Sequence, residues 1–185
     1  MRIGLTQRVL YHRGRAYDAT EHGWYQYLKE HTLVPVPNGL DQDFAAWAQE
    51  LDALIITGGD DSAIRRSTEL KLATQFHLLK KPILGVCHGA FLMTEVLGGS
   101  VEPVEGHLDT EHSVFYFGEM HSVNSYHNQS IRKLHRSATE LVVDSTGNCE
   151  AWIDSTIAGV VWHPERQTTP WLPDEIKSLI FKEKS

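Results

Sequence analysis

A cysteine between two glycines is the residue of this sequence best suited to covalent chemistry. Cys87 follows the apolar run 82–86, with Gly85 two residues before it, Gly89 two residues after it and a helix-like segment beyond. So tight a turn from strand to helix strains the residue at its apex and leaves no room for flanking side chains. A helix N-terminus favours thiolate, so Cys87 is predicted to be a nucleophile and the His88 amide an oxyanion donor. A small buried structural cysteine is the alternative.

Two further strand ends carry residues that fit the same chemistry. In GVVWHPER, His163 ends an apolar run, Pro164 stops that strand and Glu165 follows. A nucleophilic cysteine needs a base, and the base needs an acceptor that fixes its tautomer, which His163 and Glu165 can supply. In TGGDD, Gly58 and Gly59 let bare backbone approach a ligand and predict a second oxyanion amide, that of Gly59. These residues together predict acyl transfer through a thioester.

The order of apolar patterns indicates how these residues are positioned. Strand-like runs alternate with helical patterns up to residue 97, and further strand-like runs then precede a last helix around 176–180. This order predicts an α/β fold: a doubly wound, mostly parallel sheet flanked by helices, with antiparallel strand additions in the C-terminal half. Ligands bind beyond the carboxyl ends of such strands, where all three motifs lie. Residues 1–185 are expected to form a single domain.

Composition narrows the classes of protein to consider. The chain has 185 residues, 41% hydrophobic and 22% charged, and its net charge of −7 argues against a nucleic-acid binder. No apolar run approaches the roughly 18 residues of a membrane span, and the first residues are too quickly polar for a signal peptide. Two cysteines make no disulfide framework, so the protein is expected to be cytoplasmic. Cys149 is expected to be structural.

Eleven histidines raise the question of a metal site. The residues concerned are close in the sequence: His107, Asp109, Glu111, His112 and His121. No pair among them shows the HExxH or CxxC spacing of common zinc sites. We therefore expect a scattered, mostly exposed set of side chains and no dedicated metal site.

The three motifs resemble those of the class I glutamine amidotransferase superfamily, and the resemblance runs from GLTQR to WHPE. It implies a triad of Cys87, His163 and Glu165, a γ-glutamyl amide substrate and no cofactor. The stretch VNSYHNQSI is similar to the NSxHHQ signature of the γ-glutamyl hydrolase branch, which includes the γ-glutamyl-GABA hydrolases. By that match, the residues expected to line the glutamyl pocket are Ser125, Tyr126 and His127.

Some positions depart from the family pattern. Members commonly have a glutamine four residues after the nucleophile, where this chain has Phe91, and Asn128 replaces the second histidine of the γ-glutamyl hydrolase signature. CHG also occurs in the PfpI-like superfamily, in which the histidine next to the cysteine is catalytic, so His88 is the alternative base. The separate HPE strand favours His163, because adjacent residues of a tight elbow rarely face the same way.

The N-terminal stretch bears on the substrate. GLTQRVLYHRGRAY is similar to stand-alone family members of bacterial surface-polysaccharide pathways. One activity in that group is hydrolysis of γ-glutamyl-CDP-amidate to glutamate and CDP-amidate, a step toward capsule phosphoramidate. The expected partner is thus a small γ-glutamyl molecule, nucleotide-linked in this interpretation, and neither nucleic acid nor a membrane. Hydrolysis of another γ-glutamyl amine, such as γ-glutamyl-GABA, is an alternative.

Basic residues near the first strand agree with a phosphorylated leaving group. Gln7 and Arg8 follow strand 2–6 and belong at the same sheet edge as Cys87. Arg8, with Arg13 and Arg15 on the following loop, could pair with phosphates. An alternative is that Arg8 forms a salt bridge with one of two acidic residues of the TGGDD loop, Asp60 or Asp61.

Two further interpretations use the same residues. A glutaminase subunit would deliver ammonia from glutamine to a separate synthetase, which would then be a protein partner. A binding protein whose triad has lost its catalytic activity is disfavoured, because the cysteine, histidine and glutamate are all present.

Overall fold

The computed structural model describes residues 1–39 and 41–181. Its helices are α1 (His22–Tyr27), α2 (Phe44–Glu50), α3 (Ala63–Leu78), α4 (His88–Val96), the 3₁₀ helix η1 (Pro164–Arg166) and α5 (Asp174–Phe181). Its strands are β1 (Arg2–Thr6), β2 (Arg8–His12), β3 (Arg15–Ala19), β4 (Thr32–Val36), β5 (Ala53–Ile56), β6 (Ile83–Val86), β7 (Ser100–Pro103), β8 (Thr110–Tyr116), β9 (Glu119–Ser125), β10 (Gln129–Lys133), β11 (Thr139–Asp144), β12 (Cys149–Asp154) and β13 (Ile157–Val160).

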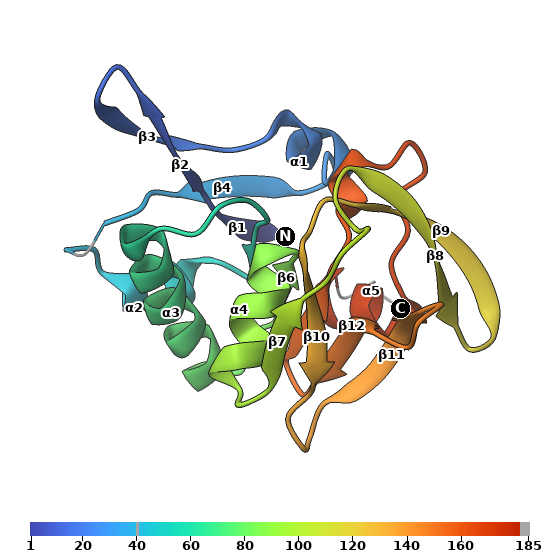
Figure 1. Cartoon of the computed structure of the whole chain (residues 1–185). Helices are drawn as coiled ribbons and strands as arrows, with labels where there is room; N and C mark the ends of the chain where they lie inside the picture. Colours follow the sequence, from blue (N-terminus) through green and yellow to red (C-terminus); the bar gives the residue numbers. More distant parts are fainter. Residues whose placement is uncertain (40, 182–185) are drawn as a thin grey trace.

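One large sheet organises the molecule (Figure 1). Its parallel part has the strand order β4-β1-β5-β6-β13. The antiparallel strands β12, β11, β8 and β9 continue it in that order, and β10 pairs with both β12 and β7. The predicted α/β fold with antiparallel additions in the C-terminal half is therefore confirmed.

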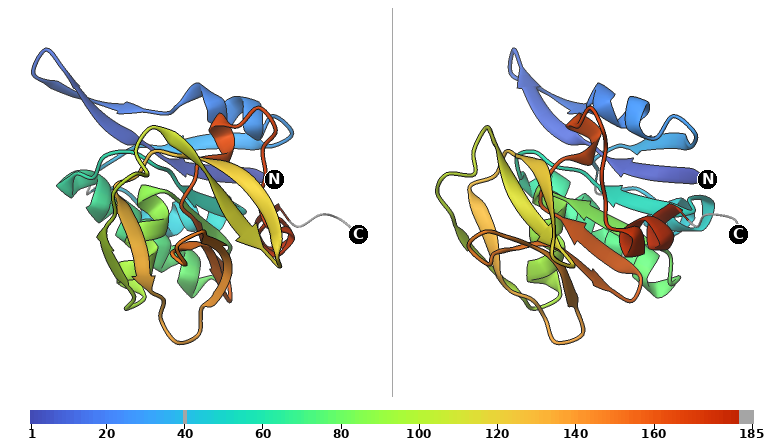
Figure 2. Two further views of the ribbon diagram at one scale, coloured as in Figure 1. Left: turned by 45° about the vertical axis from the view of Figure 1, so that its right-hand side comes forward. Right: turned by 90° about the vertical axis from the view of Figure 1, so that its right-hand side faces the viewer.

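The strand order places the three predicted motifs side by side. Strand β6 lies between β5 and β13, so the segments that follow these strands leave the sheet at the same edge. The three strands are buried along their whole length, which explains why their sequences are continuously apolar rather than alternating. Helix α4 packs on β5, β6 and β13, and Figure 2 shows α5 on the other side of these strands.

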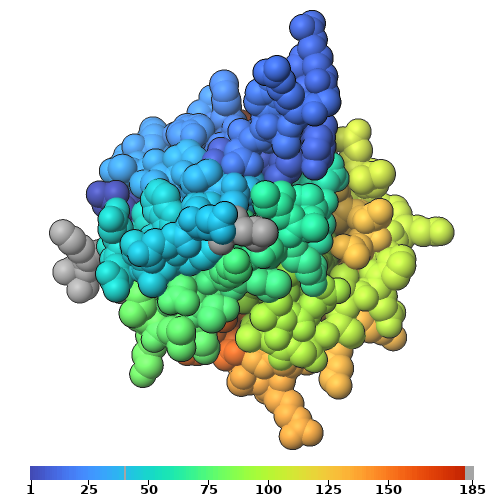
Figure 3. Space-filling model, turned by 90° about the vertical axis from the view of Figure 1, so that its left-hand side faces the viewer, coloured from blue at the N-terminus to red at the C-terminus, as the bar shows by residue number. Residues whose placement is uncertain are grey.

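The N-terminal hairpin was not predicted. The segment expected to be a loop around Arg13 and Arg15 forms β2 and β3, which pair with each other and not with the large sheet. Arg13 and Gly14 both have positive φ values, 49° and 74°, as a tight hairpin turn requires. Figure 3 shows the hairpin standing out from the body of the molecule. Its strands are largely exposed, so they carry little of the apolar signal on which the prediction relied.

Membrane-spanning helices are not found within the described residues, where no helix combines the necessary length and apolar character.

Candidate active site

Cys87 occupies the strained turn that its glycine neighbours predict. Its φ and ψ are 50° and −105°, an unfavourable backbone conformation for a residue with a Cβ atom. A Cβ on Gly85 would collide with the carbonyl of Gly89, and a Cβ on Gly89 would collide with the carbonyl of Ile56. The Cys87 amide is held by the Val160 carbonyl of β13 at 2.8 Å. The two glycines therefore let strand β6 turn into α4 within one residue.

His163 and Glu165 form a buried pair next to the cysteine. The His163 Nδ1 and Glu165 Oε1 atoms are 2.7 Å apart, and the two residues are 1% and 6% exposed. Burial lowers the pKa of His163, but hydrogen bonds and charge interactions with Cys87 and Glu165 outweigh it and raise this pKa to about 9. The imidazolium form is thus stabilised between the sulfur and the carboxylate. The three residues meet as the sequence predicts.

Two neighbours fix the position of His163. Asn124 forms two hydrogen bonds with the His163 backbone. The Asn124 Nδ2 donates to the His163 carbonyl at 2.8 Å, and the His163 amide donates to Asn124 Oδ1 at 2.9 Å. Gly58 lies against the ring, where a Cβ would collide with it. The sequence analysis did not single out Asn124, although it is the second residue of VNSYHNQSI and matches the Asn that opens the NSxHHQ signature.

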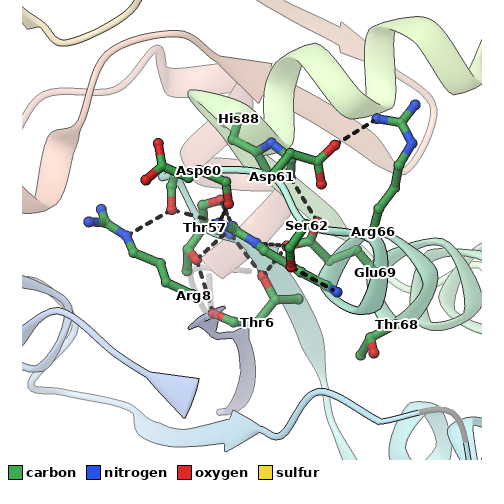
Figure 4. A network of polar contacts seen from close by, with 12 residues as sticks. Thr6, Arg8, Thr57, Asp60, Asp61, Ser62, Arg66, Thr68, Glu69 and His88 are labelled. Carbon is green, nitrogen blue, oxygen red and sulfur yellow. Dashed lines mark hydrogen bonds and ion pairs between the residues drawn. The ribbon is translucent and has the colours of Figure 1, made fainter. Parts of the chain in front are cut away.

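A second histidine–glutamate pair flanks Cys87. The His88 Nε2 and Glu69 Oε2 atoms are 2.9 Å apart. The other carboxylate oxygen of Glu69 accepts from the Thr6 hydroxyl at 2.8 Å and from Arg65 Nε at 2.8 Å. Figure 4 shows how His88, Glu69 and Thr6 come together from α4, α3 and β1. Arg65 also donates to the carbonyls of Thr57 and Asp60, so this network holds the glycine loop after β5.

A cavity of about 270 Å³ opens over the cysteine. Cys87, His163, His88 and Gly59 line it from the ends of β5, β6 and β13, and Tyr126 and Phe91 close its sides. Gly59 has a φ of 114°, and a Cβ there would collide with the Arg8 side chain. The volume lies near the lower end of the range for small-molecule sites.

Arg8 lies at this cavity, but its predicted acidic partners are wrong. Arg8 Nη2 pairs with Glu21 Oε2 at 2.9 Å, and Arg8 Nε donates to the Gly58 carbonyl at 3.0 Å. Of the two acidic residues proposed from the sequence, Asp61 instead pairs with Arg66 at 3.3 Å, as Figure 4 shows. Arg13 and Arg15 belong to the projecting hairpin and are not among the residues that line the cavity.

Arg166 is a cavity residue that the sequence analysis missed. Its Nε and Nη2 atoms donate to the two oxygens of Glu21 at 2.9 and 2.8 Å, and its guanidinium stacks on the Tyr126 ring at 4.6 Å. Partial burial raises the pKa of Glu21, but Arg166 and Arg8 together hold it below its ordinary value. Two guanidiniums thus share one carboxylate, so this group of three side chains carries a net positive charge, while Asp60 and Asp61 also line the cavity. The position of Arg166 directly after WHPE was the sequence signal that could have identified it.

The residues predicted to bind substrate divide into two groups. Tyr126 and His127 line the cavity, and the His127 ring contacts Phe91 edge-on with ring centres 5.9 Å apart. The structure does not bring Ser125 or Gln7 into the cavity lining. Ser125 is fully buried and donates to the His107 carbonyl, while Gln7 Nε2 donates to the Thr20 hydroxyl at 3.2 Å. Strand alternation points Ser125 away from the side that Tyr126 faces.

The expectation of scattered, exposed histidines is wrong for His107 and His112. Their rings pack together with ring centres 4.6 Å apart, and His127 lies 5.0 Å from His107 by the same measure. His121 lies elsewhere and stacks on Trp171 at 4.0 Å. Folding of the antiparallel strands brings His107 and His127 together, which the spacing within 107–121 could not indicate.

Cys149 is buried within β12, with 4% of the residue exposed. Burial is the main cause that raises the pKa of its thiol far above the ordinary range. A thiol held in its neutral form is a poor nucleophile, in agreement with the structural role predicted for it.

Comparison with known proteins places this geometry in a family. The family model described as Glutamine amidotransferase class-I matches residues 16–182. A γ-glutamyl-CDP-amidate hydrolase of Campylobacter jejuni subsp. jejuni is 30% identical over 185 residues, 90% of this chain and 91% of that protein. A glutamine-hydrolysing GMP synthase of Caldanaerobacter subterraneus subsp. tengcongensis is 28% identical over 140 residues, 70% of this chain but 27% of that protein. A solved glutamine amidotransferase of Thermotoga maritima has the same fold, with a TM-score of 0.62, 17% identity and coverage of 89% of this chain and 76% of that chain.

Proposed function

Because the chain belongs to the class I glutamine amidotransferase family, we propose that it hydrolyses a γ-glutamyl amide bond through a thioester on Cys87 and releases glutamate. The observation that carries the proposal is the interaction of one buried imidazole, that of His163, with both Cys87 and Glu165. This order of sulfur, imidazole and carboxylate is what nucleophilic acyl transfer needs.

The first half of the reaction forms the thioester. The Cys87 thiolate attacks the γ-carbonyl carbon, and the developing oxyanion accepts hydrogen bonds from the amides of Gly59 and His88. Both residues line the cavity, and the His88 amide is the first of helix α4, where backbone donors lack intrahelical partners. The imidazolium of His163 then protonates the leaving nitrogen, and the amine departs.

The second half regenerates the enzyme. His163, now neutral, takes a proton from water as the water oxygen attacks the thioester carbon. The carbon–sulfur bond breaks, glutamate leaves, and the thiolate–imidazolium pair is restored. Glu165 keeps the ring orientation through both halves, because its carboxylate accepts from Nδ1 and leaves Nε2 for the chemistry.

For the leaving group, we propose a nucleotide-linked amide, γ-glutamyl-CDP-amidate, within surface-polysaccharide phosphoramidate synthesis. The 30% identical relative is named for that activity. The cavity of about 270 Å³ suits a glutamyl group, so a nucleotide would extend past its rim. Arg8 and Arg166 line the cavity and share the carboxylate of Glu21, and guanidiniums pair with phosphates through two hydrogen bonds.

The test is glutamate release, measured by mass spectrometry, from a panel of γ-glutamyl compounds. We expect γ-glutamyl-CDP-amidate to be turned over faster than glutamine or γ-glutamyl-GABA. Arg8→Ala should lower kcat/KM for the nucleotide-linked substrate by about 10- to 100-fold, as expected for the loss of a charged hydrogen bond, and affect glutamine far less. Equal losses on both substrates would reject phosphate recognition by Arg8 and leave the hydrolase proposal intact.

A glutaminase subunit that supplies ammonia to a synthetase is the second candidate. The match to a glutamine-hydrolysing GMP synthase, of which this chain covers 27%, supports it, as does a match of 64 residues to a pyridoxal 5′-phosphate synthase subunit, PdxT. Under this alternative, the isolated chain would release little glutamate from any substrate. Adding a synthetase would then stimulate glutamine hydrolysis strongly.

A further inference from the structure

Three histidines and one glutamate converge beside the active-site cavity without hydrogen-bond partners at their facing atoms. We call His107, His112, His127 and Glu150 the His–Glu cluster. Nδ1 of His107, both ring nitrogens of His112, Nε2 of His127 and Oε2 of Glu150 are all buried, and the described residues offer none of these atoms a hydrogen-bond partner. The side chains of His127 and Glu150 are 2% and 1% exposed. Buried polar atoms left in this way are costly unless something else binds them.

A hydrogen bond behind the His127 ring and an ion-pair contact behind the His107 ring indicate which nitrogens face the centre as lone pairs. His127 Nδ1 lies 2.7 Å from the Gln129 carbonyl, which can accept but not donate, so Nδ1 carries the proton. His107 Nε2 lies 3.6 Å from Asp144 Oδ2, which favours the proton on that nitrogen too. The inward atoms, His107 Nδ1 and His127 Nε2, are therefore both acceptors. A backbone carbonyl or carboxylate behind each ring is the arrangement that orients metal-binding histidines.

The distances across the centre fit a bound cation better than direct contact. Nδ1 of His107 and Nε2 of His127 are each 4.0 Å from an oxygen of Glu150, and His112 Nε2 is 3.5 Å from Glu150 Oε2. The ligand atoms of His107, His127 and Glu150 all lie within 4.8 Å of one another. Two atoms bound at about 2.0–2.1 Å to a tetrahedral zinc ion are about 3.4 Å apart, so a small inward movement would complete such a site.

We infer that the His–Glu cluster binds one divalent transition-metal ion of the zinc type. A set of three imidazoles and one carboxylate is suited to zinc and its neighbours rather than to calcium or magnesium, which prefer oxygen ligands. The sequence analysis considered only the segment 107–121, whereas His127 and Glu150 both lie outside it and join it only in the folded chain.

The bound ion would fasten one wall of the active-site cavity. His107 precedes β8, His127 follows β9, and Glu150 belongs to β12, so one ion would tie two loop segments to the sheet. His127 and its neighbour Tyr126 line the cavity, and the His127 ring packs on Phe91. The ion would act as a positioning element, because the Cys87 reaction described above needs no metal.

The test is the metal content of untagged protein purified without chelators, measured by mass spectrometry of the elements. We expect close to one equivalent of zinc per chain in the wild type, and loss of that metal in Glu150→Gln. The amide in this variant keeps the shape of the side chain and can donate to an imidazole lone pair, so the fold should persist. His112→Ala, at a ring 17% exposed, is the second variant. His121→Ala, on the same hairpin but outside the cluster, is the matched control and should keep its zinc.

Binding and spectroscopy complete the test. Competition with a chromophoric chelator should show that Glu150→Gln weakens zinc affinity by at least about 100-fold. Cobalt should give the intense visible absorption of a tetrahedral site in the wild type and not in this variant. Wild-type protein without metal above background, or with equal metal in wild type and Glu150→Gln, would overturn the inference. These readouts need no substrate, so they stand or fall separately from the proposed hydrolase function.

Discussion

Two histidine–glutamate pairs contribute a histidine to the cavity that Cys87 lines, and their surroundings differ. In the pair after β13, Glu165 Oε1 is hydrogen-bonded to His163, and Glu165 Oε2 has no hydrogen-bond partner among the described residues. In the pair between α3 and α4, Glu69 serves His88 but also accepts from Arg65 and Thr6. Arg65 and Glu69 are both fully buried, so the guanidinium already balances that carboxylate.

In the proposed mechanism, this difference separates a pair that moves a proton from one that holds structure. The negative charge of Glu165 is available to stabilise the imidazolium of His163 during turnover, and the raised pKa of about 9 reflects it. The charge of Glu69 is shared with Arg65, whose other donors fix the loop that presents Gly58 and Gly59. Similar residue pairs therefore have different roles because of what else binds the carboxylate.

The sulfur that both pairs flank sets the largest expected effect. Cys87→Ser should lower glutamate release by about 10⁴-fold or more, because the hydroxyl is a far weaker nucleophile next to the same base. Thermal unfolding should stay near that of the wild type, since the substitution is nearly isosteric. Turnover retained in this variant would mean that neither pair serves a cysteine nucleophile.

The two histidines test the comparison directly. His163→Gln should lower kcat by about 10²- to 10⁴-fold, the usual contribution of a general base. His88→Gln is the matched variant; it keeps the backbone amide at the proposed oxyanion position and should lower kcat no more than about tenfold. Both are measured by glutamate release under saturating substrate. The reverse ranking would transfer the base role to His88 and refute the triad.

The two glutamates should separate stability from activity. Glu69→Gln leaves the buried Arg65 guanidinium without its counter-charge and should lower the free energy of unfolding by about 3–5 kcal/mol. Glu165→Gln should instead lower kcat and change stability less. Chemical denaturation and steady-state kinetics of both variants measure the contrast. A Glu69→Gln protein with the stability and the kcat of the wild type would contradict the structural role of that pair.

The pH dependence of stability should carry the signature of His163. Its folded pKa of about 9 lies above the unfolded value of 6.5, so its stabilising contribution is complete below pH 6.5 and is lost as the pH rises through 9. The loss should be about 3–4 kcal/mol, from about 1.4 kcal/mol for each of the roughly 2.5 pKa units between these values. Denaturation at several pH values would show it in wild type and not in His163→Gln. Cys87→Ser should show a smaller effect, because the sulfur contributes to the shift.

Local sequence signals predicted that Cys87, His163 and Glu165 meet, but not the polar networks around them. The glycines around Cys87 and the stop at Pro164 act within a few residues, so they indicate a turn wherever the strand lies. The alternation of elements up to residue 97 then put three strand ends at one sheet edge. The partner of Arg8 was wrong because the β2–β3 hairpin, which was not predicted, pairs Arg8 with Ala19 and so brings Glu21 next to it.

The sequence by itself therefore determined the sheet, the strained turn at Cys87 and the residues that meet there, since backbone propensity and apolar period are local properties. Tertiary structure decided which carboxylate each charged side chain pairs with, that Ser125 is buried away from the cavity, and that His127, which follows β9, faces Glu150 of β12. The partner of a polar side chain depends on which strand edges and loops pack together. A side chain a few residues away from a motif can reach partners on any of these segments. The physical reason is that burial strengthens polar interactions and removes water as a competitor, so that the final neighbours, and not the residue types, set each group's role.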